Sequence, residues 1–100
     1  MKNCYIIRLS SYRIAIADLT DYYNEGMMLT RINVPKEFRN IKYGTELLGA
    51  ILTDADKDKV TLFLEISPSD GLDYDQLERW YLNHGFKHWK GIYRRKPKGE

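Results

Sequence analysis

One stretch of the sequence decides how the rest is read: Val34-Pro35-Lys36-Glu37-Phe38-Arg39-Asn40-Ile41-Lys42-Tyr43-Gly44-Thr45-Glu46-Leu47-Leu48. An apolar run leads into it, and Pro35 cannot donate to a sheet ladder, so a strand is predicted to end there. Three basic side chains follow, and Gly44 stands where a helical pattern opens. The first turn of a helix has unpaired N–H groups and the positive end of the dipole. Strand, basic loop and helix start therefore predict an anion site, in which Arg39 and Lys42 add charge.

The loop also resembles a known phosphate site. The segment from Arg39 to Thr45 is similar to the acetyl-CoA pyrophosphate loop of the GNAT N-acetyltransferases, Arg/Gln-x-x-Gly-x-Gly/Ala. Arg39 and Gly44 match that pattern, and Lys42 stands at its first glycine. Downstream, the segment Trp80-Tyr81-Leu82-Asn83-His84-Gly85-Phe86 resembles the family's Leu-Tyr-x-x-x-Gly-Phe end. The resemblance covers roughly residues 26–96 and is to the small kind of member found in some phages.

The resemblance implies an α/β (α+β) fold. We expect a mainly antiparallel mixed sheet that is splayed at the central strand, residues 27–34, with two helices packed on it. The family's N-terminal helices are missing, because the chain has no room for them before Cys4. Residues 1–96 then form one truncated GNAT-like domain, and residues 97–100 a disordered tail. The wall on the acceptor side must be minimal, or be supplied by a second copy of the chain or by another protein.

Local patterns predict the individual elements. A β-rich hairpin covers 4–9 and 13–19, a polar loop covers 20–26, and a closing hairpin covers 86–89 and 92–96. In the strand 27–34, alternation places Met28, Thr30, Ile32 and Val34 on one face and Leu29 on the other. Apolar residues at offsets of 3, 4, 7 and 8 from Gly44 predict a helix ending near 56–58. A buried strand over 60–66 and a helix that Gly85 stops complete the pattern.

The resemblance also implies which residues bind acetyl-CoA. The free backbone groups at the splayed strand end would pair with the pantetheine arm, and the loop and helix start would hold the pyrophosphate. At position 42 a side chain either crowds the phosphate or binds it through its ammonium. The expected cofactor-binding residues are Ile32, Asn33, Val34, Arg39, Asn40, Ile41, Lys42, Tyr43, Gly44 and Thr45.

Acetyl transfer from a thioester to an amine needs a proton acceptor for the amine, a donor to the carbonyl and an acid for the leaving thiolate. The resemblance implies that Tyr81 is that acid; a packed aromatic with a satisfied hydroxyl is the alternative. The base stays open between Glu25, Glu65 and a water chain, since Met28 occupies the place where some members carry a glutamate. We favour a position for Glu65 at the solvent-exposed end of a strand, because buried glutamates are rare.

The expected function is an acetyl-CoA-dependent N-acetyltransferase acting on a primary amine by direct attack in a ternary complex. The alternatives are a catalytically inactive acyl-CoA-binding protein, favoured by Met28, and a small interaction or nucleic-acid-binding protein that uses the basic C-terminus. A net charge of +2 does not imply nucleic acid, and we expect no metal. We expect no membrane partner, since no run has transmembrane length. A single cysteine and the lack of a signal peptide predict the cytoplasm, that of the host if the protein is phage-encoded. Exposed apolar edges also make a homodimer plausible.

Overall fold

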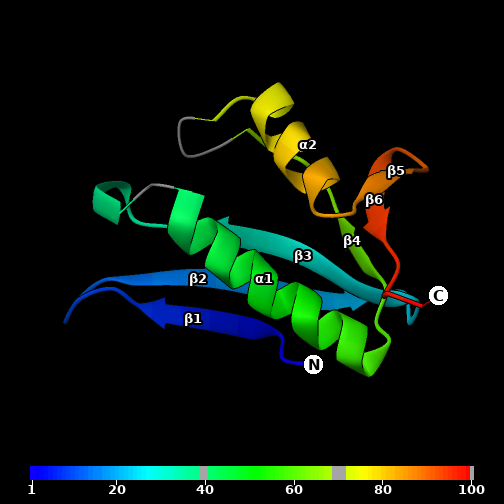
Figure 1. Ribbon diagram of the computed structural model, residues 1–100, viewed down its shortest axis with the longest axis horizontal. Helices are drawn as coiled ribbons and strands as arrows, with labels where there is room; N and C mark the ends of the chain where they lie inside the picture. The colour runs from blue at the N-terminus through cyan, green and yellow to red at the C-terminus, as the bar shows by residue number, and fades with distance from the viewer. Residues whose placement is uncertain (39–40, 69–71, 100) are drawn as a thin grey trace.

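The computed structural model describes residues 1–38, 41–68 and 72–99, without the side chain of Ile41, as a six-stranded sheet with helices on one face (Figure 1). The strands lie in the order β1-β2-β3-β4-β6-β5, and only the pair β3–β4 is parallel. This confirms the predicted mixed, mainly antiparallel sheet with two helices. The elements are β1 Cys4–Arg8, β2 Ile14–Tyr22, β3 Gly26–Asn33, η1 Lys36–Phe38, α1 Ile41–Asp58, β4 Leu62–Leu64, α2 Tyr74–Asn83, β5 Lys87–Trp89 and β6 Ile92–Arg95.

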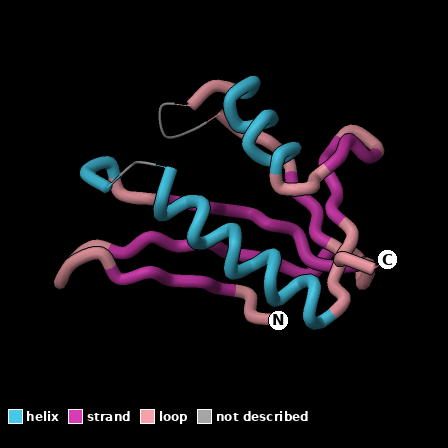
Figure 2. The backbone as a smooth tube through the Cα atoms, viewed as in Figure 1, coloured by secondary structure: helices cyan, strands magenta, loops and turns pink. Residues whose placement is uncertain are grey.

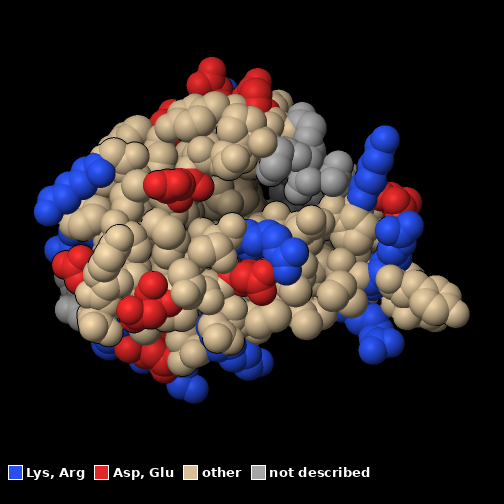
Figure 3. All heavy atoms as spheres, turned by 180° about the vertical axis from the view of Figure 1, so that it is seen from behind, with Lys and Arg blue, Asp and Glu red and all other residues tan. Residues whose placement is uncertain are grey.

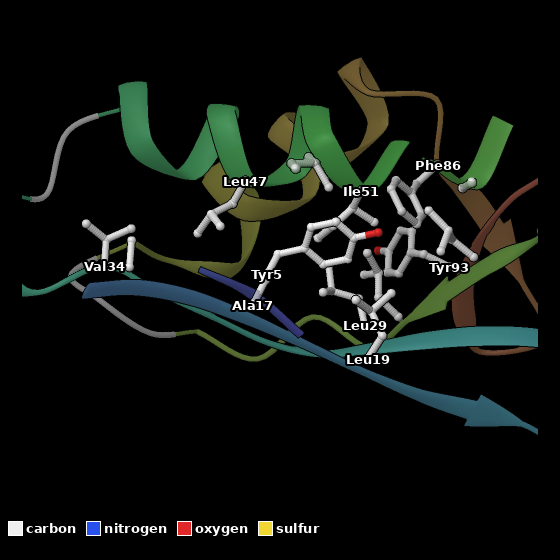
Figure 4. Close-up of a cluster of buried hydrophobic side chains, with 14 residues drawn as sticks. Tyr5, Ala17, Leu19, Leu29, Val34, Leu47, Ile51, Phe86 and Tyr93 are labelled. Carbon is white, nitrogen blue, oxygen red and sulfur yellow. The ribbon is translucent and has the colours of Figure 1, made fainter. Parts of the chain in front are cut away.

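The core lies between the sheet and the helices (Figures 2 and 4). Helix α1 packs across β1, β2 and β3, where two fully buried alanines, Ala15 and Ala17, let its backbone come close to the sheet. The predicted apolar stripe of α1 supplies the other side of this core through Leu47, Leu48, Ile51 and Ala55. Aromatic residues of the C-terminal half, Phe86 and Tyr93 among them, complete the same cluster.

The two central strands separate after a short contact. Strand β3 has eight residues, but β4 pairs with it only from Met27–Leu62 to Leu29–Leu64. Beyond Leu29, β3 continues beside β2 while the chain after Leu64 leaves the sheet. The splay predicted at this strand is therefore present, and it opens toward the end of β3 that leads to α1.

A β-bulge in β3 changes which side chains face the core. Asp18 pairs with Arg31 and Leu19 with Leu29, so Thr30 has no partner across the ladder; its hydroxyl donates to the Asp18 carbonyl at 3.1 Å. The extra residue reverses the alternation. Leu29, Ile32 and Val34 consequently pack on the same core, which corrects the strict alternation predicted for this strand.

Several element boundaries also differ from the predictions. Strand β2 runs on to Tyr22 because it pairs with the start of β3, so the loop predicted over 20–26 is a short turn. Helix α1 begins at Ile41, three residues before Gly44, and β4 is shorter than the apolar run 60–66. The end of α1 at Asp58, the Gly85 stop with φ of 95° and the closing hairpin agree with the predictions.

The end of the chain is held by a buried ion pair. Arg95 is 8% exposed, and its guanidinium donates to both carboxylate oxygens of Asp56 in α1 at 2.8 and 3.1 Å. The same carboxylate accepts from the Lys98 backbone N–H, and Pro97 is buried. Pro97 and Lys98 are thus placed against the end of α1, whereas the disorder predicted for 97–100 stays a prediction.

No helix of the described residues covers the opposite face of the sheet, and we call it the bare face. Viewed from that side, most of the surface is uncharged and a recess opens near its centre (Figure 3). Ile6 and Ile14 are 57% and 43% exposed there, and the Arg31–Asp18 ion pair lies beside the bulge. Farther along, Phe63 is covered by the rings of Tyr22 and Trp89.

Candidate functional site

The first turn of α1 lies beside the splayed end of β3. No acidic side chain stands in this turn, so its N–H groups and dipole present an uncompensated positive end. A Cβ added at Gly44 would lie 3.7 Å from two ring atoms of Trp80 in α2, which is an ordinary contact. The fold itself therefore does not require glycine at position 44, although it brings the two helices together there.

Thr45 provides an observation that bears on a ligand. Within the described part of the chain, its Oγ1 is the single buried side-chain polar atom with no hydrogen-bond partner. A threonine in a helix ordinarily donates to the carbonyl four residues earlier, as Thr53 does to Gly49 at 2.9 Å. An unpaired buried hydroxyl costs about 1–3 kcal/mol. Thr45 and the first-turn amides of α1 therefore fit an oxygen-rich anion such as a pyrophosphate.

The structure describes some of the remaining loop residues fully, one in part and two not at all. Lys42 is exposed, with its ammonium 5.7 Å from the Tyr43 ring centroid. Tyr43 meets Phe38 of η1 edge to face and packs against the core. Ile41 opens the helix, and its side chain is not described. Arg39 and Asn40, both predicted to bind the cofactor, lie outside the described residues.

The edge of β3 faces the opening between the central strands. In an antiparallel ladder, every second residue directs its N–H and C=O away from its partner strand. Between Thr30 and Asn33, such groups point from β2 toward the side that β4 has left. Ile32 and Val34 turn their side chains into the core and Asn33 is exposed, so the edge of β3 up to Asn33 presents backbone groups to a ligand.

The ring of Trp80 lies between the start of α1 and Tyr81. The Trp80 ring contacts position 44 and lies 4.9 Å from the Tyr81 ring, which packs edge to face on Phe86. No residue that the structure describes forms a hydrogen bond with the Tyr81 hydroxyl. Burial raises the pKa of Tyr81 to about 12, so the hydroxyl is protonated at neutral pH and available as a donor.

The structure separates the two candidate bases. Glu65 directly follows Leu64, the last paired residue of β4, and is exposed at the point where the strands part. Glu25 lies in the turn before β3; eight residue steps of about 3.3 Å place it roughly 26 Å from Asn33. Glu65 and the β3 edge thus lie at the opening, whereas Glu25 lies at the opposite end of β3.

Sequence reasoning missed two parts of this site. The sequence predicted no role for Trp80, although its ring lies between position 44 and Tyr81. The bulge at Thr30 left no signal in the sequence, because it is a property of the pairing with β2. The unpaired hydroxyl of Thr45 likewise depends on its surroundings.

The basic C-terminal cluster is not a uniform exposed patch. Arg95 is buried against Asp56, and the Arg94 guanidinium lies 4.9 Å from the Trp89 ring centroid. Among the described residues, no group of three or more His, Cys, Asp or Glu could hold a metal ion. The helices described here include none that is long and apolar enough to span a bilayer.

The chain resembles known proteins in its structure. By sequence, no protein-family model and no curated protein matches the chain. By structure, it is similar to an acetyltransferase of the GNAT family from Staphylococcus aureus Mu50 (TM-score 0.64, 20% identity, 84% of this chain). The chain spans 60% of the length of that acetyltransferase.

A second similar structure has nearly the same extent. The anti-CRISPR protein AcrVA5 superimposes with a TM-score of 0.61 at 15% identity, over 93% of this chain and 98% of AcrVA5. Both likenesses concern the fold, since both identities are low. The splayed sheet, with α1 and α2 on one face, is therefore a GNAT-like acetyltransferase fold.

Proposed function

We propose that the protein is an acetyl-CoA-dependent N-acetyltransferase acting on a primary amine. The observation that carries the proposal is the opening between β3 and β4, which has a helix N-terminus at one end and an unpaired tyrosine hydroxyl beneath α2. A thioester cosubstrate with an anionic tail and an amide-rich arm matches these three features. The similarity in fold to a GNAT-family acetyltransferase supports the same reading.

Different residues would bind different parts of the cosubstrate. The first-turn amides of α1, the Thr45 hydroxyl and the charge of Lys42 would hold the pyrophosphate. The backbone of Ile32 and Asn33 would pair with the pantetheine amides as a further strand would, and Val34 belongs to this segment by resemblance. Arg39 and Asn40 belong to this set by resemblance. A backbone N–H near the bulge would polarise the thioester carbonyl.

The transfer requires three changes at the reacting atoms. Glu65 or a water molecule accepts a proton from the ammonium, and the neutral nitrogen attacks the thioester carbonyl carbon. The C–N bond forms and the C–S bond breaks, so the products are an amide and the CoA thiolate. Holding both reactants in one opening replaces a nucleophilic enzyme residue, because the direct attack becomes effectively unimolecular.

Tyr81 would act on the leaving sulfur. With a pKa of about 12, its hydroxyl is a weaker acid than an ordinary thiol, whose pKa is about 8.5. We therefore assign Tyr81 the donation of a hydrogen bond to the thiolate as it forms, after which solvent supplies the proton. Stabilising charge as it develops is a large catalytic contribution even without full proton transfer.

Binding of CoA tests the proposal directly. We expect saturating CoA to raise the melting temperature, because a ligand bound only to the folded state stabilises it. Gly44→Ala keeps the fold, since its Cβ makes an ordinary contact, but fills space next to the first-turn amides. We expect this variant to lose most of the shift. Gly49→Ala in the same helix is the matched control, because nothing lies within 4 Å of its added Cβ.

The outcomes separate the alternatives. No shift at millimolar CoA would remove both the enzyme and an acyl-CoA carrier from consideration. A shift without turnover on any amine would favour an inactive binder, consistent with Met28 on β3, where a carboxylate could otherwise serve as base. The proposal places the reaction in the cytoplasm, in keeping with the free Cys4. It assigns no role to a homodimer.

A further inference from the structure

The two sides of the opening between β3 and β4 are unlike. On the helix side, Gly44 of α1 and Trp80 of α2 come within van der Waals reach, and the cosubstrate assigned above occupies the space beside them. On the other side lies the bare face, without a helix or loop wall among the described residues (Figures 1 and 3). A second reactant of any size therefore reaches the thioester from the bare face.

The bare face is shaped for a broad partner. Its exposed Ile6 and Ile14 belong to neighbouring strands, and Ile6 pairs with Ile16. A small amine in the recess of this face (Figure 3) would leave the Ile6 and Ile14 side chains exposed. A protein acceptor would cover them, and apolar area of this kind favours association.

Charges on the bare face point to the chemistry of that partner. Glu65, at the mouth of the opening, forms no ion pair with any described residue and can receive one ammonium. Around it the charge is positive: Arg94 pairs with Phe63, two residues before Glu65, and Lys87 pairs with Arg94. Lys90 extends the positive region over Trp89. The nearby Asp18 is already neutralised by Arg31 at 2.6 Å.

We infer that the acceptor is a lysine on the surface of a protein, with acidic residues close to it, docked on the bare face. Glu65 receives the lysine ammonium, and Lys87, Lys90 and Arg94 receive the acidic neighbours. Strand spacings of about 4.8 Å put these cations within one to three residues of a lysine held at Glu65. Polyamines and lysine-rich segments are disfavoured, because their further charges meet this positive region. The inference rests on the acetyltransferase proposed above.

Two matched peptides with blocked ends test the inference: Glu-Gly-Lys-Gly-Glu and Arg-Gly-Lys-Gly-Arg, with spermidine as a small polycation. Each offers an acceptor to the enzyme at saturating acetyl-CoA, and release of free thiol is followed. We expect kcat/KM to be about tenfold higher for the acidic peptide than for the basic one, and spermidine to be the poorest. Raising the salt to 0.5 M should reduce the difference several-fold, because exposed charges are screened.

A charge reversal locates the effect. Lys87→Glu should reduce the preference for the acidic peptide by a factor of about 3 to 10 and leave the CoA-induced rise in melting temperature unchanged. Lys57→Glu makes the same charge change at an exposed site in the last turn of α1 and should leave the preference as it is.

Each other outcome has a distinct meaning. Equal use of both peptides, a preference for the basic one, or faster turnover of spermidine would overturn the inference. So would normal CoA binding with neither peptide acetylated, because the bare face would then not select a lysine by its neighbours. Absence of both a CoA shift and turnover would instead refute the proposed acetyltransferase.

Discussion

At the scale of single residues, the site combines two hydroxyls that the fold leaves without partners. Thr45 sits in the second turn of α1 and Tyr81 beneath α2, and neither is hydrogen-bonded by the residues described. Elsewhere in this chain buried phenols are paired, as Tyr5 is with Asp54 at 2.6 Å and Tyr93 with Glu78. Leaving the buried Thr45 donor unpaired is unfavourable for folding, and the Tyr81 hydroxyl is open to a partner from outside the protein, so we propose a ligand contact for each.

Tyr81→Phe tests the first of these hydroxyls. The change keeps the ring contacts with Trp80 and Phe86 and loses no protein hydrogen bond, so we expect an unchanged melting temperature and unchanged CoA binding. Turnover should fall by about 10²-fold, because the charge on sulfur loses its donor. Thiol-release kinetics and a thermal melt on one preparation measure both. A clear loss of stability with normal turnover per folded molecule would make Tyr81 a packing residue.

The pH dependence of the same reaction gives a further check. Since burial raises the pKa of Tyr81 to about 12, this group keeps its proton throughout the range in which the protein can be assayed. We expect no fall in kcat from Tyr81 ionisation between pH 8 and about 10.5. A basic limb that is present in the natural protein and absent from the Phe variant would contradict the assignment.

Thr45→Val tests the second hydroxyl. Valine has the shape of threonine but carries no unpaired donor, so the free energy of unfolding should stay the same or rise by about 1 kcal/mol. Affinity for CoA should fall by about fivefold to tenfold if the hydroxyl donates to the ligand. Urea unfolding and calorimetric titration give the two values, and a loss of stability with full affinity would point to a hidden partner within the protein.

At the scale of elements, the approach of β3 to β4 depends on one glycine. A Cβ at Gly26 would lie 2.1 Å from the Thr61 carbonyl oxygen and 3.1 Å from the Phe63 ring. That carbonyl accepts from the Met27 N–H at 3.0 Å and begins the only parallel contact in the sheet. The start of the opening is thus fixed by backbone packing at the opposite end of β3.

Gly26→Ala should therefore be costly. Backbone atoms of β4 would have to move, and overpacking of this kind lowers the free energy of unfolding by about 1–3 kcal/mol. Gly49→Ala is again the control, and we expect it to stabilise the protein by about 0.5–1 kcal/mol through helix propensity. Urea midpoints measure both, and equal midpoints for the two variants would show that β3 and β4 are not packed as closely as described.

Local sequence predicted elements whose limits are set by their own residues. The α1 stripe, its end and the Gly85 stop are of this kind. Prediction from local sequence failed where pairing with a neighbouring strand sets the end of an element. Examples are the length of β2, the short β4 and the Thr30 bulge. Within the site, the family resemblance predicted the β3 edge and the start of α1. It could not predict the position of Trp80 or the distance of Glu25 from the opening, because both depend on packing across elements.

At the scale of the whole molecule, one ion pair joins the ends of its two halves. Arg95 of β6 holds Asp56 of α1 and also donates to the His84 carbonyl at the end of α2. The Arg95 guanidinium holds the pKa of Asp56 below its ordinary value of 3.8. A carboxylate whose pKa is lowered on folding stabilises the folded state above its ordinary pKa and loses that contribution as the pH falls through the lowered value.

Asp56→Asn should accordingly reduce stability by about 2–3 kcal/mol at neutral pH, since it leaves Arg95 buried beside an uncharged amide. The difference between the natural protein and the variant should stay constant above pH 5 and shrink below pH 4. Urea unfolding at several pH values measures this difference. A difference that does not change between pH 7 and pH 3 would show that the loss comes from packing rather than from charge.

The brief contact between β3 and β4 also divides the molecule dynamically. The meander β1–β3 packs under α1, whereas β4, α2 and the final hairpin form the rest, joined to it by the shared core, a three-residue ladder and the ion pair between Asp56 and Arg95. Amide hydrogens of β2 should then exchange only on global unfolding, and those of Leu62–Leu64 through a cheaper parting of the halves. A ligand lying across the opening would touch both halves. It should therefore slow exchange in β4 far more than in β2 and couple the two halves more tightly.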